Sequence, residues 1–118
     1  MGQIQTSNQK LVAAETYTTG TCSSNTVTIN AESGLITTES LTTAAEAVTE
    51  LTVTNSGCVA GSIISASIVN YAGTTGIPVV YADNAGSGSF KIQVNNASSA
   101  AALNGVLKIY FTCLPALV

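Results

Sequence analysis

Charge is the feature that this 118-residue chain has least of, since only 8% of its residues are Asp, Glu, Lys or Arg. Typical soluble domains carry about a quarter. There is no Arg, and the three basic residues are Lys10, Lys91 and Lys108. A nucleic-acid-binding surface must neutralise several phosphates with clustered basic side chains. Three scattered lysines on a chain of net charge -3 argue against such a surface, and they disfavour an anionic membrane as a partner.

Histidine and tryptophan are absent, which limits the chemistry open to the protein. Histidine is the usual base that activates a serine or cysteine nucleophile. The remaining route is a pair of carboxylates in a sugar-binding cleft, and four Tyr with no Trp are too few to line one. We therefore expect no enzymatic activity, no catalytic residue and no cofactor, and we expect the acids to be solvated surface groups: Glu15, Glu32, Glu39, Glu46, Glu50 and Asp83.

Cysteines are few and widely spaced, at positions 22, 58 and 113. They form no CxxC motif, and no His is present to complete a zinc site, so no metal is expected. One disulfide with a spare thiol remains an open alternative. The favoured interpretation is that the cysteines are small buried residues in strands. Cys113 fits it best, because in LKIYFTC it continues the alternation of Leu107, Ile109 and Phe111.

Long apolar runs are also missing, although 46% of the residues are hydrophobic. A membrane-spanning helix needs about 18 consecutive apolar residues, and Thr, Ser and Gly interrupt every run here. The first ten residues, MGQIQTSNQK, lack the basic region followed by an apolar stretch that marks a secretory leader. We therefore expect an intact start and synthesis in the cytoplasm.

Alternating apolar and polar residues fill the chain from Thr26 onward. In SFKIQVNN, Phe90, Ile92 and Val94 recur with the period of a strand that has one buried face. The same period predicts strands at residues 26–30, 35–41, 48–55, 62–71, 77–82, 89–96 and 106–114. Seven or eight short strands at this spacing predict an all-β fold, an antiparallel β-sandwich of the immunoglobulin-like or jelly-roll type. Residues 26–118 would form this domain, and the polar residues 1–25 a flexible N-terminal arm.

The sequence also predicts which strands lie at the centre of a sheet and which lie at an edge. Residues 62–71 form the longest run rich in Ile and Val, which predicts a central strand. Pro78 cannot donate a backbone hydrogen bond to a ladder, so the strand at 77–82 is predicted to lie at a sheet edge. The residues expected in the core are Val53, Ile68, Phe90, Ile92, Ile109 and Phe111.

Turn signals separate these strands. Residues 83–88, DNAGSG, predict a turn, and a single carboxylate is too few for a calcium site. Residues 44–47 are predicted as a loop or an edge, and residues 100–103 as a short helical turn. The triplet Asn96–Ser98 matches a glycosylation acceptor, a match that we attribute to chance.

The exposed strand faces are rich in neutral Thr, Ser and Asn. Hydroxyls and amides lose less free energy than ions when an interface strips them of water. A dispersed monomer normally uses charge to stay soluble, so this surface predicts packing against copies of the same chain. We expect the subunit contacts to include or adjoin Thr52, Thr54 and Tyr110. A neighbouring copy should cover the sheet edge near Pro78, and the N-terminal arm should become ordered when it binds a scaffold.

Residues 34–112 resemble a group of small β-sandwich proteins from tailed bacteriophages and aquatic viruses. The similar pieces are LITTESLTTAA, LTVTNS, GIPVV, GSFKIQVNN and ALNGVLKIYF, in this order. Proteins of this group are virion components on the capsid or a fibre, and are often trimeric. Cys22, Cys58 and the final LPALV have no place in the resemblance.

Together the resemblance and the neutral surface predict a virion structural protein assembled in the host cytoplasm. It would be a capsid decoration or cement protein, or a head-fibre or spike subunit. Its partners would be further copies, as a homotrimer, and the major capsid protein or another virion protein. One alternative is a receptor- or carbohydrate-binding adhesin module, with Tyr71 and Tyr81 clustered at one end. Another is a small hydrolase that uses one of the acids.

Overall fold

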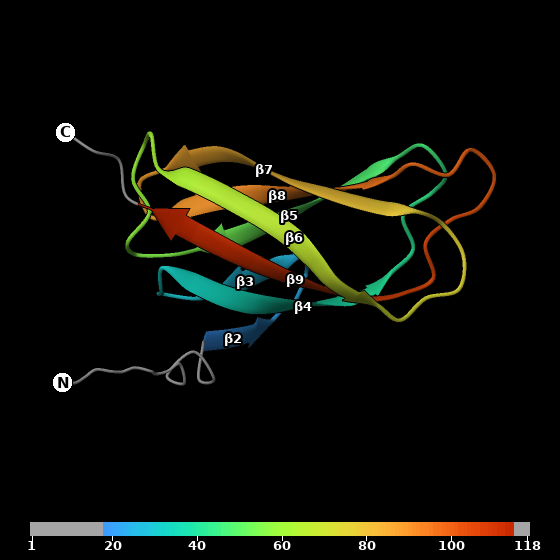
Figure 1. Ribbon diagram of the computed structural model, residues 1–118, viewed down its shortest axis with the longest axis horizontal. Helices are drawn as coiled ribbons and strands as arrows, with labels where there is room; N and C mark the ends of the chain where they lie inside the picture. The colour runs from blue at the N-terminus through green and yellow to red at the C-terminus, as the bar shows by residue number, and fades with distance from the viewer. Residues whose placement is uncertain (1–17, 115–118) are drawn as a thin grey trace, which may run out of the picture.

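The computed structural model describes residues 18–114, which form eight strands and no helix (Figure 1). The strands are β2 (Thr18–Thr21), β3 (Thr26–Thr28), β4 (Ser33–Leu41), β5 (Val48–Thr54), β6 (Ile63–Tyr71), β7 (Pro78–Gly86), β8 (Ser89–Asn96) and β9 (Gly105–Leu114). They confirm the all-β sandwich that the period-two pattern predicts. The bounds differ mainly at β7, which continues through residues 83–86 that were expected in a turn.

Two four-stranded sheets form the layers, with strand orders β2-β4-β9-β6 and β3-β5-β8-β7. Pairing is antiparallel except at β2–β4 and β3–β5, where the two short first strands run parallel to their neighbours. The chain therefore contributes residues 18–21 to a sheet, within the arm expected at 1–25. The rest of that arm, residues 1–17, lies outside the described residues, so its contact with a scaffold stays a prediction.

The core forms where the alternating residues of the two sheets face each other. Val53, Phe90, Ile92, Ile109 and Phe111 are all fully buried, which confirms five of the six expected core residues. Phe90 of β8 and Phe111 of β9 join the layers, with ring centroids 5.3 Å apart and planes tilted by 57°. This edge-tilted geometry is favourable for aromatic pairs.

The order of the strands places β6 and β7 at edges on the same side of the sandwich (Figure 1). Pro78 begins β7 at a sheet edge, as expected. The prediction that residues 62–71 form a central strand is wrong, because β6 pairs only with β9. Ile68 is correspondingly wrong as a core residue, since 36% of it is exposed. Its run of Ile and Val indicated burial, but no strand covers its second edge.

Loops at one end are held by Asn96, whose side chain is fully buried. Its Nδ2 donates to the carbonyl oxygens of Thr43, Ala44 and Ala101, and its Oδ1 accepts from the amides of Ile77 and Ser98. The amide group that a glycan would need is thus occupied inside the fold. The loop at 44–47 is confirmed, whereas the prediction of a helical turn at residues 100–103 is wrong: the Ala101 carbonyl oxygen there is bound by Asn96.

Candidate association surface

The side of the sandwich that β6 and β7 form is open to solvent, unlike the opposite side. Its inward-facing residues on the two edge strands are only half-buried or exposed: Ile64, Ala66, Ile68, Val80 and Ala82. On the opposite side, Val27, Ile29 and Ile36 are at most 5% exposed. We call the free edges of β6 and β7, with these five inward residues, the open side. It is a part of the core that the described chain does not finish covering.

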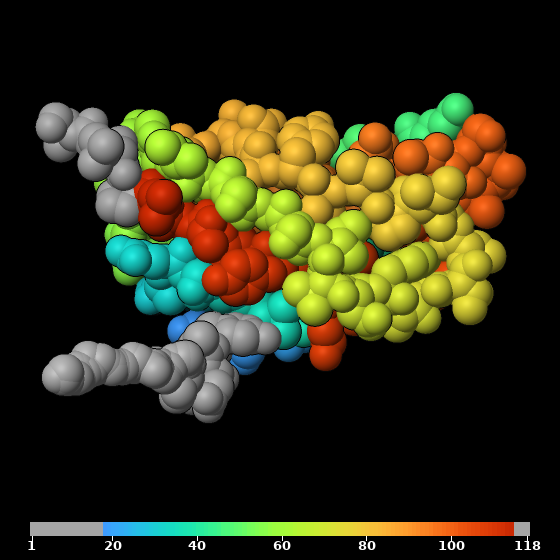
Figure 2. All heavy atoms as spheres, viewed as in Figure 1, coloured from blue at the N-terminus to red at the C-terminus, as the bar shows by residue number. Residues whose placement is uncertain are grey.

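Further apolar side chains project around the open side. Ile63, Val69, Ile77, Val79 and Tyr81 are all exposed large hydrophobic residues, and Val69 is 57% exposed. Figure 2 shows β6 and β7 side by side on the surface of the molecule. From residue 61 to residue 88 the only charged residue is Asp83. These residues lie on or next to the two strands that border the open side, on the outer faces of both sheets. A concentration of exposed apolar groups on neighbouring strands is typical of an interaction site.

The backbone along the open side is available for pairing. In the described sheets, β6 has a strand neighbour only in β9, and β7 only in β8. A bulge between Ile68 and Asn70 leaves Val69 without a partner on β9, and a second bulge lies between Asp83 and Gly86. Bulges and Pro78 shorten the regular edges, but neither edge carries the lysines that proteins use against unwanted strand addition. The free regular stretches are residues 63–68 and 79–83.

A crevice of about 150 Å³ opens between the two edge strands near the start of β6. Ser62, Ile64 and residues 82–85 line it. Its one carboxylate, on Asp83, accepts a hydrogen bond from the amide of Asn84 at 2.8 Å. The crevice is therefore a small indentation in the open side, with the polar residues Ser62, Asp83 and Asn84 in its lining.

The contact residues expected from the sequence do not form one surface. Thr52 and Thr54 lie on the outer face of β5, and Tyr110 lies on the outer face of β9 in the other sheet. The Thr52 hydroxyl accepts a hydrogen bond from Lys91 Nζ at 2.8 Å, and Glu50 lies 3.9 Å from the same nitrogen. The open side was not predicted from the sequence. A signal for it was present, because residues 61–88 contain a single charged residue in a stretch of 28.

The two tyrosines proposed for an adhesin do not cluster. The Tyr71 hydroxyl donates to the carbonyl oxygen of Thr75 at 2.6 Å and accepts from the amide of Asn104 at 2.8 Å. Tyr71 therefore fastens two loops together at the end of β6. Tyr81 lies on the outer face of β7 and is 51% exposed, so it alone is free to stack on a ligand.

The described acids are dispersed and engaged with different partners. Glu39 accepts a hydrogen bond from the amide of Asn25 at 2.9 Å, and Glu50 accepts one from Gln93 Nε2 at 2.8 Å. Within residues 18–114 no three His, Cys, Asp or Glu residues gather where they could hold a metal ion. Likewise, no helix in this range is long and apolar enough to cross a membrane.

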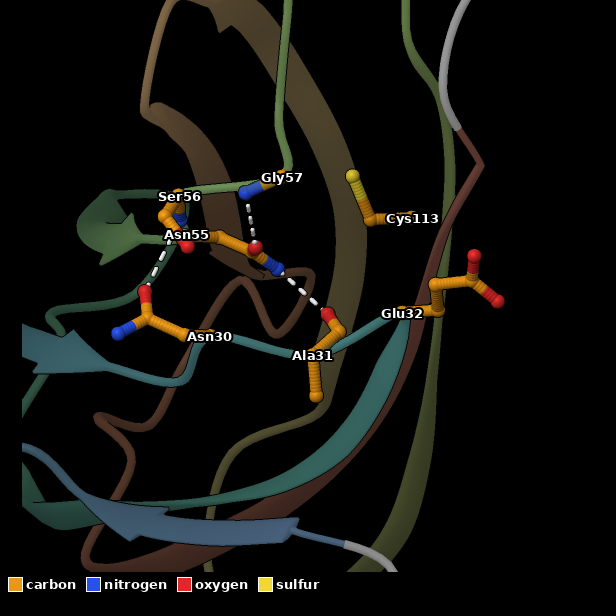
Figure 3. Close-up of a pocket in the computed structure, with 7 residues that line it drawn as sticks. All are labelled: Asn30, Ala31, Glu32, Asn55, Ser56, Gly57 and Cys113. Atoms are coloured by element: carbon orange, nitrogen blue, oxygen red, sulfur yellow. Dashed lines mark hydrogen bonds between the residues drawn. The ribbon is translucent and has the colours of Figure 1, made fainter.

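A second cavity, of about 320 Å³, lies at the end of the sandwich where Cys113 is found (Figure 3). Asn30 and Asn55 point into it, but their side chains are bound to the protein itself. Asn30 Oδ1 accepts from the amide of Ser56, and Asn55 bridges the Ala31 carbonyl oxygen and the Gly57 amide. These bonds join the turn after β3 to the loop after β5. The polar side chains that line the cavity therefore hold two loops together.

The chain matches no family model, no curated protein and no solved structure. The open side is the largest departure of the described fold from a closed sandwich, since apolar inward residues there stay partly exposed.

Proposed function

We propose that the protein is a virion structural subunit that acts by binding other polypeptide, and that copies of the chain meet through the open side. Its place would be that of a capsid decoration or cement protein, or of a head-fibre or spike subunit. The observation that carries the proposal is the incomplete burial of Ile64, Ile68 and Val80 between two free strand edges.

Covering the open side with protein is favourable for two physical reasons. Apolar surface removed from water contributes about 25 cal/mol per Å². The free amide and carbonyl groups of β6 and β7 can pair with a strand of the partner. Only Asp83 would have to be desolvated as an ion in this region, so little of the gain is lost.

A second copy of the chain fits this surface better than an unlike partner. Both edges are almost uncharged, so two copies meet without like-charge repulsion, and no oppositely charged partner is required. Because β6 and β7 both present a free edge on one side, β6 of one copy can meet β7 of the next. Such a head-to-tail contact closes into a ring when the rotation allows it. The expected homotrimer is a ring of this kind, with the half-buried residues of the open side around its axis.

The mechanism would be mechanical rather than chemical. An oligomer bound across neighbouring capsid subunits adds contact area that must be broken before the shell can expand. A stable protein contact buries about 800 Å² per partner. The nine residues of β6 extend for roughly 30 Å, at about 3.3 Å per residue. Strands of this length give a ring enough edge to hold together before it binds a capsid.

Light scattering coupled to size exclusion tests the self-association. The wild-type chain should elute with the mass of three 11.9 kDa copies. Val69→Lys, which places a charge on the open side, should shift the protein towards the monomer. The matched control is Val48→Lys, at a valine with a similar exposure of 51% on the outer face of β5. Far-UV circular dichroism should show both variants folded.

A wild-type monomer at every concentration, or equal behaviour of the two variants, would refute association through the open side. The virion role is tested separately by co-sedimentation with empty capsids of the same virus. An oligomer that does not sediment with capsids would remove the virion role while leaving self-association intact.

The alternative of a receptor- or carbohydrate-binding module now depends on Tyr81. Binding on a glycan array that disappears in Tyr81→Ala but persists in Val48→Lys would favour it over the structural role. Tyr71→Ala is unsuitable as the test, because it would loosen the loops around Asn104.

A further inference from the structure

Cys58 and Cys113 meet at the end of the sandwich next to the larger cavity, although they are far apart in sequence. Cys58 lies in the loop between β5 and β6, and Cys113 lies in β9. Both are buried, with at most 3% exposed. The resemblance to virion proteins gives Cys58 no place, and neither cysteine is among the residues that define the open side, although Cys113 pairs with Ile64 of β6.

The backbone holds both residues firmly. The Cys58 amide donates to the Asn55 carbonyl oxygen at 3.0 Å, and the Cys58 carbonyl oxygen accepts from the Gly88 amide at 2.9 Å. The Cys113 amide donates to the Glu32 carbonyl oxygen at 2.7 Å, and Cys113 pairs with Ile64 of β6. The Cys58 thiol also donates to the Ser89 carbonyl oxygen at 3.3 Å, a bond that a disulfide would replace.

The two thiols are in side-chain contact. The Cys58 and Cys113 side chains are close enough to interact, and Ser62 lies beside the Cys113 thiol. In Figure 3 the sulfur of Cys113 points towards the segment at Gly57, the residue before Cys58, while the Glu32 carboxylate points elsewhere. The third cysteine, Cys22, is placed elsewhere: its amide donates to the Thr37 carbonyl oxygen, and Glu39 is the charge near its thiol.

We propose that Cys58 and Cys113 form a disulfide in oxidising surroundings, while Cys22 stays a free thiol. The reaction is thiol–disulfide exchange with a small disulfide such as oxidised glutathione. One thiolate attacks the oxidant and releases one reduced glutathione. The second thiolate then attacks the mixed disulfide and releases another. Two thiols lose two protons and two electrons, and the oxidant gains them.

The cavity gives the oxidant an approach, because Cys113 is one of the residues that line it. Burial, together with the neighbouring Cys58, raises the pKa of the Cys113 thiol. The attacking species is the thiolate, so oxidation should accelerate as the pH rises above neutrality. This inference is independent of the proposed function, since it concerns the isolated chain in any oligomeric state.

The test uses the full chain with Cys22→Ser, which leaves only the two proposed partners. After incubation with oxidised glutathione at mildly alkaline pH, the intact mass should fall by two hydrogen atoms. Trypsin should cut after Lys10, Lys91 and Lys108 in the unfolded, unreduced protein. The fragment 11–91 should then run joined to the fragment 109–118, and a reductant should separate them. Wild type treated in the same way should keep one alkylatable thiol, at Cys22.

A stability measurement adds an independent readout. A bridge from residue 58 to residue 113 closes a long loop of the unfolded chain, so oxidation should raise Tm by at least about 10 °C. A reductant should reverse the shift, and Cys58→Ala should show none. Two thiols that stay alkylatable, a glutathione adduct on one cysteine alone, or a wild-type bridge to Cys22 would each overturn the proposal.

Discussion

Replacing Asn96 with Ala is the sharpest single test of how the loops of this sandwich are held. The fully buried amide makes five hydrogen bonds to backbone groups of three separate segments, at distances from 2.8 to 3.2 Å. Truncation removes the side-chain partner of the Ala101 carbonyl oxygen and of the Ile77 and Ser98 amides, whereas the Thr43 and Ala44 carbonyl oxygens still accept from the amides of Leu103 and Ala47. A typical hydrogen bond contributes about 1 kcal/mol net, and an unsatisfied buried group costs more. We expect the free energy of unfolding to fall by about 3–5 kcal/mol.

Total stabilities of about 5–15 kcal/mol make this a large fraction of the whole. Urea unfolding followed by circular dichroism measures it. The matched control is the adjacent Asn95→Ala, on the outer face of β8 between Val48 of β5 and Val79 of β7, which should cost less than about 1 kcal/mol. Asn96→Asp keeps the shape but turns a donor into an acceptor facing three carbonyl oxygens, so it should also destabilise strongly at neutral pH.

Equal stabilities of Asn96→Ala and Asn95→Ala would refute the reasoning. The loops at 43–47, 77 and 98–101 would then be held by their own contacts, with the amide only filling space between them.

Two further predictions concern a close backbone approach and a buried thiol. A Cβ added at Gly105 would lie 2.4 Å from the backbone nitrogen of Gly73, whereas one at Gly86 meets nothing within 4 Å. Gly105→Ala should therefore lower the urea midpoint by the equivalent of about 2–3 kcal/mol, and an unchanged midpoint relative to Gly86→Ala would contradict this. Burial, with Glu39 nearby, raises the pKa of Cys22 from 9.0 to about 11. The folded state thus keeps its proton to higher pH, and its stability should be full below pH 9 and fall by about 2–3 kcal/mol as the pH rises to 11. Unfolding at pH 8 and 11 measures this, and an identical pH dependence in Cys22→Ala would disprove it.

The open side and the cysteine pair place different demands on the same fold. In the proposed function, the open side must stay uncovered until a partner binds it. An uncharged strand edge is easy for a partner to cover, but it also carries a risk of non-specific association. The bulges at Val69 and beyond Asp83 limit that risk, because they confine regular pairing to a few residues. A bridge between Cys58 and Cys113 would stiffen the end of the sandwich next to the start of β6, where Cys113 pairs with Ile64.

The amino-acid sequence by itself determined the local structure of the chain. Alternation in β8 and β9 placed Phe90, Ile92, Ile109 and Phe111 on buried faces, because a strand turns successive side chains to opposite sides wherever it lies. The lack of His and the sparse Lys are the reasons why neither catalysis nor nucleic-acid binding is expected, and both expectations stay predictions.

Only the tertiary structure decided which strands lie next to one another. The apolar run of β6 has the composition of a central strand, yet pairing over long sequence distances leaves it at an edge and exposes Ile68. The same long-range pairing brings Cys58 to Cys113 and sets five backbone groups around Asn96. The local alternation of residues decides which face of a strand a side chain occupies. Which strands pair with one another depends instead on how the two sheets pack over one core.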